Sequence, residues 1–151
     1  MEIRSARPED IDSLVGLLEE LFAIEEDFTF DRQRQADGLH MMIEASSSAV
    51  FVAVHNTRVI GMISGQLTIS NAEGGYALLI EDLRVVENMR KKGVGKALLH
   101  AVGDWGNERG ADRMQLLADN SNRTALSFYE RNGWRQSKLI CLRSRQPSMS
   151  R

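Results

Sequence analysis

The sequence predicts a mixed α/β fold: a mostly antiparallel sheet with a parallel central pair of strands and helices on both faces. Two observations support this prediction. Three apolar segments separated by short polar turns follow one another in the middle of the chain, which is typical of an antiparallel meander. An amphipathic helix then joins the third segment to a later strand, and such a crossover makes the two strands parallel neighbours. No repeat or linker divides the chain, so we expect one domain over residues 1–143 and a disordered tail over residues 144–151.

The composition is that of an ordinary globular protein. Of the 151 residues, 42% are hydrophobic and 26% are charged, which suffices for one domain with a buried core. The formal net charge of -2 gives no overall positive field, so we expect no nucleic-acid partner. No apolar segment approaches the roughly 20 residues that span a bilayer, and the N-terminus lacks the apolar core of a signal peptide. We therefore expect no membrane partner and a cytoplasmic location.

Two helices are predicted in the first third of the chain, after a strand over Glu2–Arg7. Pro8 and the acidic residues that follow it are typical of the first turn of a helix. Apolar residues then recur at helical spacing: Ile11, Leu14, Val15, Leu18, Leu21 and Phe22. This stripe indicates a helix packed on the core, with Glu20 largely outside the packed face. Asp31 is a suitable N-cap for a second helix that runs to about Ala45.

The remaining elements follow from apolar periodicity and from turn residues. The strands of the meander are predicted over Ala49–Val54, Val59–Ser70 and Tyr76–Val86. A helix that buries Val94, Leu98 and Trp105 follows, and Gly110 ends it. The last elements are predicted as a strand over Arg113–Ala118, a helix over Asn122–Asn132 and final strands over Trp134–Arg143. Cys141, the only cysteine, is expected as a small apolar residue of the last strand, and no disulfide can form within the chain.

The segment between the third strand of the meander and its helix combines glycine with positive charge. Its sequence, called the glycine loop below, is Arg90-Lys91-Lys92-Gly93-Val94-Gly95-Lys96. Gly93 and Gly95 lack a Cβ atom, so their amides can approach a ligand closely. The helix that they open leaves its first N–H groups unpaired and carries partial positive charge at this end. The glycine loop is therefore predicted to bind phosphate.

Two common nucleotide-binding loops do not fit the glycine loop. A P-loop needs an earlier glycine and a Ser or Thr after the lysine, where this chain has Arg90 and Ala97. A dinucleotide fingerprint needs a third glycine where Leu98 stands. The loop resembles instead the Arg-x-x-Gly-x-Gly sequence with which the GNAT family of N-acetyltransferases binds the pyrophosphate of acetyl-coenzyme A.

A second motif of that family follows in the expected order and spacing. Residues 116–134 contain a strand, an Asn-x-x-Ala-x-x-x-Tyr helix and a glycine followed by an aromatic residue. The resemblance covers nearly the whole chain and is closest to the acetyltransferases of small amines and diamines. It implies the GNAT fold, acetyl-coenzyme A as co-substrate, and direct acetyl transfer to the primary amine of a small cationic molecule without a metal ion. It also implies a homodimer.

The resemblance implies roles for individual residues. The main-chain N–H of Leu83 would meet the acetyl carbonyl, and Tyr129 would protonate the departing sulfur. The residues implied in cofactor binding are Leu83, Arg84, Val85, Arg90, Lys91, Lys92, Gly93, Val94, Gly95, Lys96, Asn122 and Tyr129. Structural roles stay open beside these: Asn122 also suits a helix N-cap, and Tyr129 also suits an aromatic pair with Phe128.

The residue that removes the proton of the amine is sought on the third strand of the meander. Side chains alternate between faces along a strand, so only one of Glu81 and Asp82 can face the acceptor. Glu81 has the strand parity of Leu83 and resembles the acidic residue that small-amine acetyltransferases place beside the incoming amine. We predict Glu81 as a general base or as an anchor for a cationic substrate.

The acceptor is suggested by an acidic segment between the first two helices. In the resembled fold this connection borders the acceptor site, so Glu25, Glu26 and Asp27 are predicted to select a cationic amine; a solvated helix end is the alternative. Two other functions stay open: a protein acetyltransferase acting on lysine or an N-terminal amine, and a non-catalytic module that senses acyl-coenzyme A. A sensor would lack Tyr129 and the acidic group on the strand, and this chain keeps both.

Overall fold

The computed structural model describes residues 1–24 and 29–146. Contacts within the chain divide it into two compact units, Met1–Leu116 and Leu117–Arg151. The first unit contains, in chain order, β1 (Glu2–Ser5), the 3-10 turn η1 (Pro8–Asp10), α1 (Ile11–Ile24), α2 (Arg32–Glu44), β2 (Ser48–His55), β3 (Arg58–Ser70), β4 (Gly75–Val85), the 3-10 turn η2 (Glu87–Met89), α3 (Val94–Glu108) and β5 (Arg113–Leu116). The second unit contains α4 (Arg123–Arg131). No helix in the described part of the chain is long and apolar enough to cross a bilayer.

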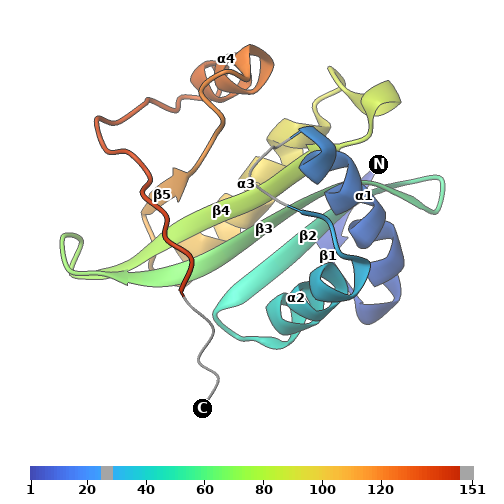
Figure 1. Ribbon diagram of the computed structural model, residues 1–151, viewed down its shortest axis with the longest axis horizontal. Helices are drawn as coiled ribbons and strands as arrows, with labels where there is room; N and C mark the ends of the chain where they lie inside the picture. Colours follow the sequence, from blue (N-terminus) through green and yellow to red (C-terminus); the bar gives the residue numbers. More distant parts are fainter. Residues whose placement is uncertain (25–28, 147–151) are drawn as a thin grey trace. The chain divides into compact units, whose positions relative to one another are not determined.

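The strands of the first unit form one sheet in the order β1-β2-β3-β4-β5 (Figure 1). Strands β1 to β4 pair antiparallel; Phe51 of β2, for example, lies opposite Ile63 of β3. β4 and β5 run parallel, and Leu78 of β4 pairs with Met114 of β5. The predicted meander, and the parallel pair joined by a helical crossover, are confirmed.

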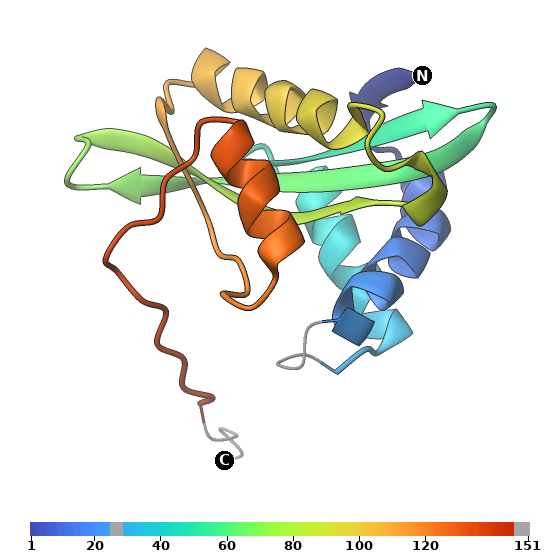
Figure 2. The same ribbon diagram turned by 90° about the horizontal axis from the view of Figure 1, so that it is seen from above.

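Helices cover both faces of this sheet, with α1 and α2 on one face and α3 on the other (Figure 2). The face under α1 and α2 carries a core cluster in which Leu14, Val15 and Met62 are fully buried. On the opposite face α3 approaches closely, because a Cβ atom at Gly65 would lie only 2.6 Å from Val102 Cγ2. Most of the apolar stripe predicted for each of α1 and α3 is buried, but Trp105 of α3 is only partly buried.

Local chemistry determines where two of the helices begin. Asp31 Oδ1 accepts hydrogen bonds from the backbone N–H groups of Gln33 (3.1 Å) and Arg34 (3.3 Å), so the predicted N-cap of α2 is confirmed. α3 begins after Gly93, whose φ of 83° lies in the left-handed region that favours glycine. The residue before this helix is therefore constrained by its backbone conformation and not only by its place in a motif.

The final strands predicted over Trp134–Arg143 are wrong. The structure has no strand between residues 132 and 146. Three apolar side chains of this segment are each at least 80% exposed: Leu139, Ile140 and Leu142. Apolar residues form a strand only where a neighbouring strand pairs with their backbone, and in the described part of the chain no strand pairs with this segment.

Two further expectations change for the same reason. Cys141, expected in the last strand, is exposed in an irregular segment. The strand expected to continue to Ala118 ends at Leu116, where its pairing with Ile80 stops. Among the described strands β5 therefore forms one edge of the sheet, and the parallel pair lies at that edge.

Candidate active site

A β-bulge interrupts β4 where its pairing with β3 changes register. Arg84 pairs with Met62, but Glu81 pairs with Ser64. Two residues of β4 therefore lie opposite a single residue of β3, and the first of the two, Asp82, has a φ of 57°. A bulge bends its strand and changes the direction of the side chains, and bulges are frequent beside active sites.

The bulge decides which side chains of β4 share a face. Glu81 and Arg84 are three residues apart, so in an uninterrupted strand they would lie on opposite faces. Their partners Ser64 and Met62 are two residues apart on β3, and Met62 packs in the cluster under α1 and α2. Glu81 and Arg84 therefore both lie on the face that these helices cover. Strand parity therefore does not assign Glu81 and Leu83 to a common face as predicted, because the alternation stops at the bulge.

Hydrogen bonds from β3 hold Glu81 at the bulge. The buried Ser64 Oγ donates to the main-chain O of Glu81 at 3.1 Å. Gln66 Nε2 donates to Glu81 Oε1 at 3.4 Å, and the Glu81 residue is exposed. An exposed carboxylate held by a neighbouring amide can bind a cation directly or take a proton through water. Both roles predicted for Glu81 are compatible with this geometry.

Arg84 lies under α1, where the sequence did not predict a role for its side chain. Its Nη2 donates to Glu20 Oε2 at 3.3 Å, which links β4 to the exposed side of α1. The side chain of Arg84 is 14% exposed and that of Glu20 is 51% exposed. Arg84 Nε is buried and has no hydrogen-bond partner among the described residues. A largely buried guanidinium with an unused donor is unusual, because most buried polar atoms have a partner.

The glycine loop follows η2 and includes the first turn of α3. Arg90 Nε donates to Val85 O at 3.2 Å, which ties the loop to the strand. Lys91 and Gly93 both have positive φ angles, 62° and 83°, so the backbone turns sharply before the helix. The first hydrogen bond of the helix is from Ala97 N to Gly93 O (3.0 Å). The N–H groups of the preceding turn therefore have no intrahelical acceptor, as an anion site requires.

The charges and the anchoring of the glycine loop suit a phosphate group. All four cations are exposed: Arg90, Lys91, Lys92 and Lys96. Val94 is buried, and a Cβ atom at Gly61 would lie 3.3 Å from its Cγ1, so the helix start is packed on β3. Nothing lies within 4 Å of the position of a Cβ atom at Gly93. The site thus has a packed helix start, exposed cations around it and open space beside Gly93.

The other predicted residues belong to the second unit. Asn122 Oδ1 accepts a hydrogen bond from Ala125 N (3.1 Å), so the N-cap role left open for Asn122 is confirmed. The ring of Tyr129 makes edge contacts with Phe128, at 5.3 Å between centroids, and with Trp134, at 5.8 Å. The aromatic pairing left open for Tyr129 is therefore also present. The cofactor and proton-donor roles of these two residues stay predictions.

The predicted acceptor residues are not placed by the structure. Glu25, Glu26 and Asp27 lie outside the described residues. The end of β4 contains Leu83, Arg84 and Val85, whose main-chain groups are predicted to bind acetyl-coenzyme A. These residues and the glycine loop belong to the same unit of the chain. Among residues 1–24 and 29–146, no group of three or more His, Cys, Asp and Glu residues is arranged to hold a metal ion.

Comparison with known proteins identifies the family. The family model described as the acetyltransferase (GNAT) family matches residues 15–134. The aminoalkylphosphonate N-acetyltransferase of Salmonella typhimurium is 30% identical over 90% of this chain and 86% of its own. The streptothricin acetyltransferase of Streptomyces lavendulae is 30% identical over 88% of this chain and 80% of its own. The resemblance that the two sequence motifs predicted is confirmed.

Comparison with solved structures finds the same fold in other acetyltransferases. The aminoglycoside N-acetyltransferase AAC(6')-Iy, solved in complex with coenzyme A, superposes with a TM-score of 0.85 over 97% of this chain and 95% of its own, at 18% identity. The predicted mixed α/β fold is therefore shared with an acetyltransferase that binds coenzyme A. Because the family model covers most of the chain, and because acetyl-coenzyme A is the acetyl donor of that family, this protein is an N-acetyltransferase that belongs to the GNAT family.

Proposed function

We propose that this protein transfers the acetyl group of acetyl-coenzyme A directly to the primary amine of a small cationic molecule, in a ternary complex and without a covalent enzyme intermediate. The strongest support is the combination of the glycine loop with the bulge of β4. The loop offers free N–H groups and four exposed cations to a pyrophosphate. The bulge lies between Glu81 and Val85. It therefore interrupts the strand pairing at the residues whose main-chain groups are proposed to bind the acetyl carbonyl and the pantetheine arm.

In this proposal the main chain of β4 receives the thioester. The N–H of Leu83 donates to the acetyl carbonyl oxygen, where negative charge develops during attack. The main-chain groups of Arg84 and Val85 pair with the pantetheine arm as an added strand pairs with a sheet edge. The glycine loop holds the pyrophosphate, and Asn122 holds the arm with the part of its amide that the N-cap leaves unused.

The transfer forms one bond and breaks one bond. Only the free base attacks, so Glu81 first accepts through water the proton that makes the amine neutral. Once the new bond has formed, the nitrogen carries a positive charge and releases a second proton to solvent. The new bond joins the amine nitrogen to the acetyl carbon, and the bond from that carbon to sulfur breaks. Tyr129 donates a proton to the departing thiolate. Tyr129 regains its proton and Glu81 loses its own, so the products are the acetamide, free coenzyme A and one proton released to solvent, and atoms and charge balance.

Small-molecule acceptors are favoured over protein acceptors by the relatives. The names of the two similar curated enzymes specify an aminoalkylphosphonate and streptothricin, and that of the structural relative specifies an aminoglycoside. All three are acetyltransferases of small molecules by name. The acidic segment at Glu25, Glu26 and Asp27 would add attraction for a cationic amine.

The proposal is tested by release of coenzyme A thiol from acetyl-coenzyme A, with the purified protein and a panel of polyamines, aminoglycosides, aminoalkylphosphonates, amino acids and short peptides. We expect thiol release that depends on one class of small amine, with the acetylated amine identified by mass spectrometry. Thiol release without an amine, or an acetylated protein on the reaction path, would contradict direct transfer. No turnover across the panel, with acetyl-coenzyme A still binding by calorimetry, would favour a protein acceptor or a sensor.

Three properties expected from the sequence are part of the same proposal. The acetyltransferase domain extends over residues 1–143, the protein acts in the cytoplasm, and its working form is a homodimer. Light scattering after gel filtration tests the last of these, since a dimer has twice the mass of the 17.0 kDa chain.

A further inference from the structure

We infer that the side chain of Arg84 selects acceptors in which the reactive amine is accompanied by an oxyanion, such as a phosphonate, on the same small molecule. The inference rests on the acetyl transfer of the proposed function and changes its acceptor from a purely cationic molecule to one that carries both a cationic amine and an anion. The cationic amine would lie at Glu81, and the oxyanion would lie at Arg84. Four observations support this assignment: the burial of the guanidinium, its unused donor, its weak partner, and its position relative to Glu81.

The guanidinium of Arg84 is held away from water without being fully paired. Its side chain is 14% exposed, and its Nε is buried with no hydrogen-bond partner among the described residues. Leaving a buried donor unpaired destabilises a fold, because the donor has lost its hydrogen bonds to water. A ligand oxygen that accepts from Nε would recover this loss, so the free protein already holds a donor that an anion can use.

Glu20 engages only part of this guanidinium. One nitrogen, Nη2, contacts one carboxylate oxygen at 3.3 Å, and the Glu20 side chain is 51% exposed. The same chain shows what full engagement looks like: Arg4 contacts both carboxylate oxygens of Asp10, at 2.8 Å and 3.0 Å. A single long contact to an exposed carboxylate is weak. An incoming oxyanion can therefore share or displace Glu20, and the planar fork of Arg84 suits phosphonate and carboxylate groups.

The bulge places the cation and the anion of such an acceptor along one strand. Because of the register change, Arg84 and Glu81 lie on the same face of β4, the face covered by α1 and α2. Three residues of a strand span about 10 Å, and less across a bulge, so two long side chains can reach the two ends of one small molecule. Without the bulge the side chain of Arg84 would face α3, on the other side of the sheet.

The test compares three acceptors that share one carbon chain: propylamine, aminopropylphosphonate and diaminopropane. For the wild-type protein we expect the highest kcat/KM with aminopropylphosphonate. Arg84→Met keeps much of the side-chain volume and removes the charge. It should raise the KM for aminopropylphosphonate, so that kcat/KM for this acceptor, divided by kcat/KM for propylamine, falls about tenfold. Arg84→Lys keeps the charge without the fork and should lower the same ratio by a smaller factor.

Two further variants separate recognition from a structural role. Glu20→Gln removes the competing carboxylate, so KM for aminopropylphosphonate should fall. Arg109 directly follows α3; its side chain is 42% exposed and contacts Glu108. Arg109→Met should therefore leave the acceptor ratio unchanged. Equal losses for all three acceptors in Arg84→Met, or a wild-type preference for diaminopropane that Arg84→Met does not alter, would overturn the inference.

The outcome is separable from that of the proposed function. If no acceptor is acetylated, the proposed function fails, and the inference is then decided by calorimetric binding of aminopropylphosphonate to the full chain with and without Arg84→Met. Binding that Arg84→Met abolishes would support an oxyanion site at Arg84, whereas binding unaffected by this variant, or no binding to the wild-type protein, would overturn it. Thermal melting of each variant reports whether the fold is kept.

Discussion

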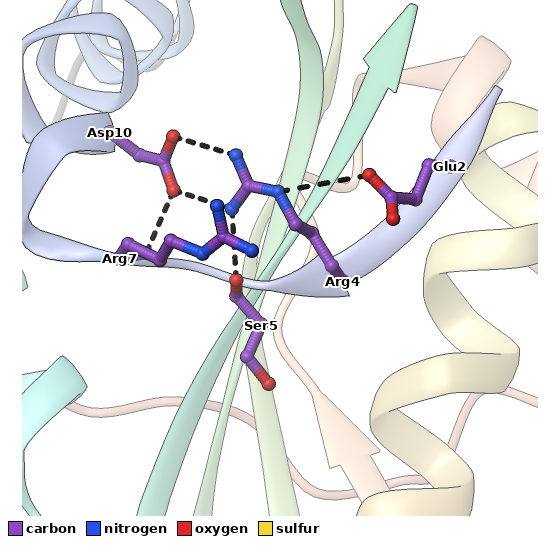
Figure 3. A network of polar contacts seen from close by, with 5 residues as sticks. All are labelled: Glu2, Arg4, Ser5, Arg7 and Asp10. Carbon is purple, nitrogen blue, oxygen red and sulfur yellow. Dashed lines mark hydrogen bonds and ion pairs between the residues drawn. The ribbon is translucent and has the colours of Figure 1, made fainter.

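Arg4 and Asp10 form a bidentate ion pair that links β1 to η1, the turn before α1. Arg4 Nη1 donates to Asp10 Oδ2 at 2.8 Å, and Nη2 donates to Oδ1 at 3.0 Å (Figure 3). The backbone N–H of Arg7 donates to the same Oδ2 at 2.7 Å. The hydrogen bonds from Arg4 lower the pKa of Asp10 below its ordinary value of 3.8, and the carboxylate in turn raises the pKa of Arg4. The pair is therefore a local element of stability that depends on pH.

Asp10→Asn should destabilise the fold at neutral pH. The side chains of Asp10 and Arg4 are only 10% and 19% exposed, so the loss of charge-assisted hydrogen bonds should cost about 2 kcal/mol. Because the pKa of Asp10 is lowered in the folded state, its contribution is complete above the unfolded value near 3.8 and is lost as the pH falls through the lower folded value. Urea unfolding of wild type and variant should therefore differ at pH 7 and converge only as the pH falls below the lowered pKa that Asp10 has in the folded state.

Asp12→Asn is the matched control for this experiment. Asp12 is exposed at the start of α1, two residues from Asp10. Its replacement should cost only the modest interaction of an acidic residue with the helix N-terminus, about 0.5 kcal/mol. Equal losses for the two variants, or a loss for Asp10→Asn that persists in acid, would contradict the assigned role of the ion pair.

Gly93→Ala should impair both the start of α3 and acetyl-coenzyme A binding. The φ of 83° at Gly93 is strained for any residue with a Cβ atom, although the space around it is open, so the loss of stability should be about 1 kcal/mol. Relief of this backbone strain should displace the first N–H groups of α3 and so raise the KM for acetyl-coenzyme A. Gly38→Ala is the control, since this helical glycine of α2 also has open space and no positive φ; it should stabilise the fold slightly. Similar effects of both changes on the KM would count against the phosphate site.

The parts of the fold predicted correctly are those with a local signal. The Asp31 cap needs only the next two or three residues, and the stripe of α3 needs only helical periodicity. The meander follows from apolar segments that short turns separate, because such segments have few alternatives to pairing with each other. The glycine loop was predicted for the same reason, since its glycines and its cations are consecutive in the chain.

The parts that were missed depend on partners distant in the sequence. The bulge at Asp82 arises from the register between β4 and β3, and an Asp in a strand pattern only weakly indicates it. Glu20 and Arg84 are 64 positions apart, so nothing local could pair them. The apolar residues near Cys141 have strand-like composition but pair with no strand in the described part of the chain, and composition alone could not reveal that.

Tyr129→Phe should lower turnover and leave the affinity for acetyl-coenzyme A nearly unchanged. Removal of the hydroxyl takes away the proposed proton donor to the leaving sulfur, an effect of about a hundredfold on kcat. The ring contacts with Phe128 and Trp134 are retained by phenylalanine, so the aromatic packing around this position should be kept. Tyr76→Phe is the control, because Tyr76 is 44% exposed at the start of β4. An undiminished rate in Tyr129→Phe would remove this residue from the mechanism.

Glu81→Gln distinguishes the two roles of the exposed carboxylate at the bulge. A general base that must be ionised gives a rate that falls at low pH, so its replacement should lower kcat and remove that arm of the profile. An anchor for the amine should instead raise the KM of the amine and leave the shape of the profile of kcat unchanged. Gln66→Ala is informative beside it, because Gln66 donates to Glu81 Oε1 and its loss frees the carboxylate without removing the charge. We expect the first pattern for Glu81→Gln and only a small change for Gln66→Ala. An increase in KM confined to the amine, in both variants, would reassign Glu81 from proton transfer to binding.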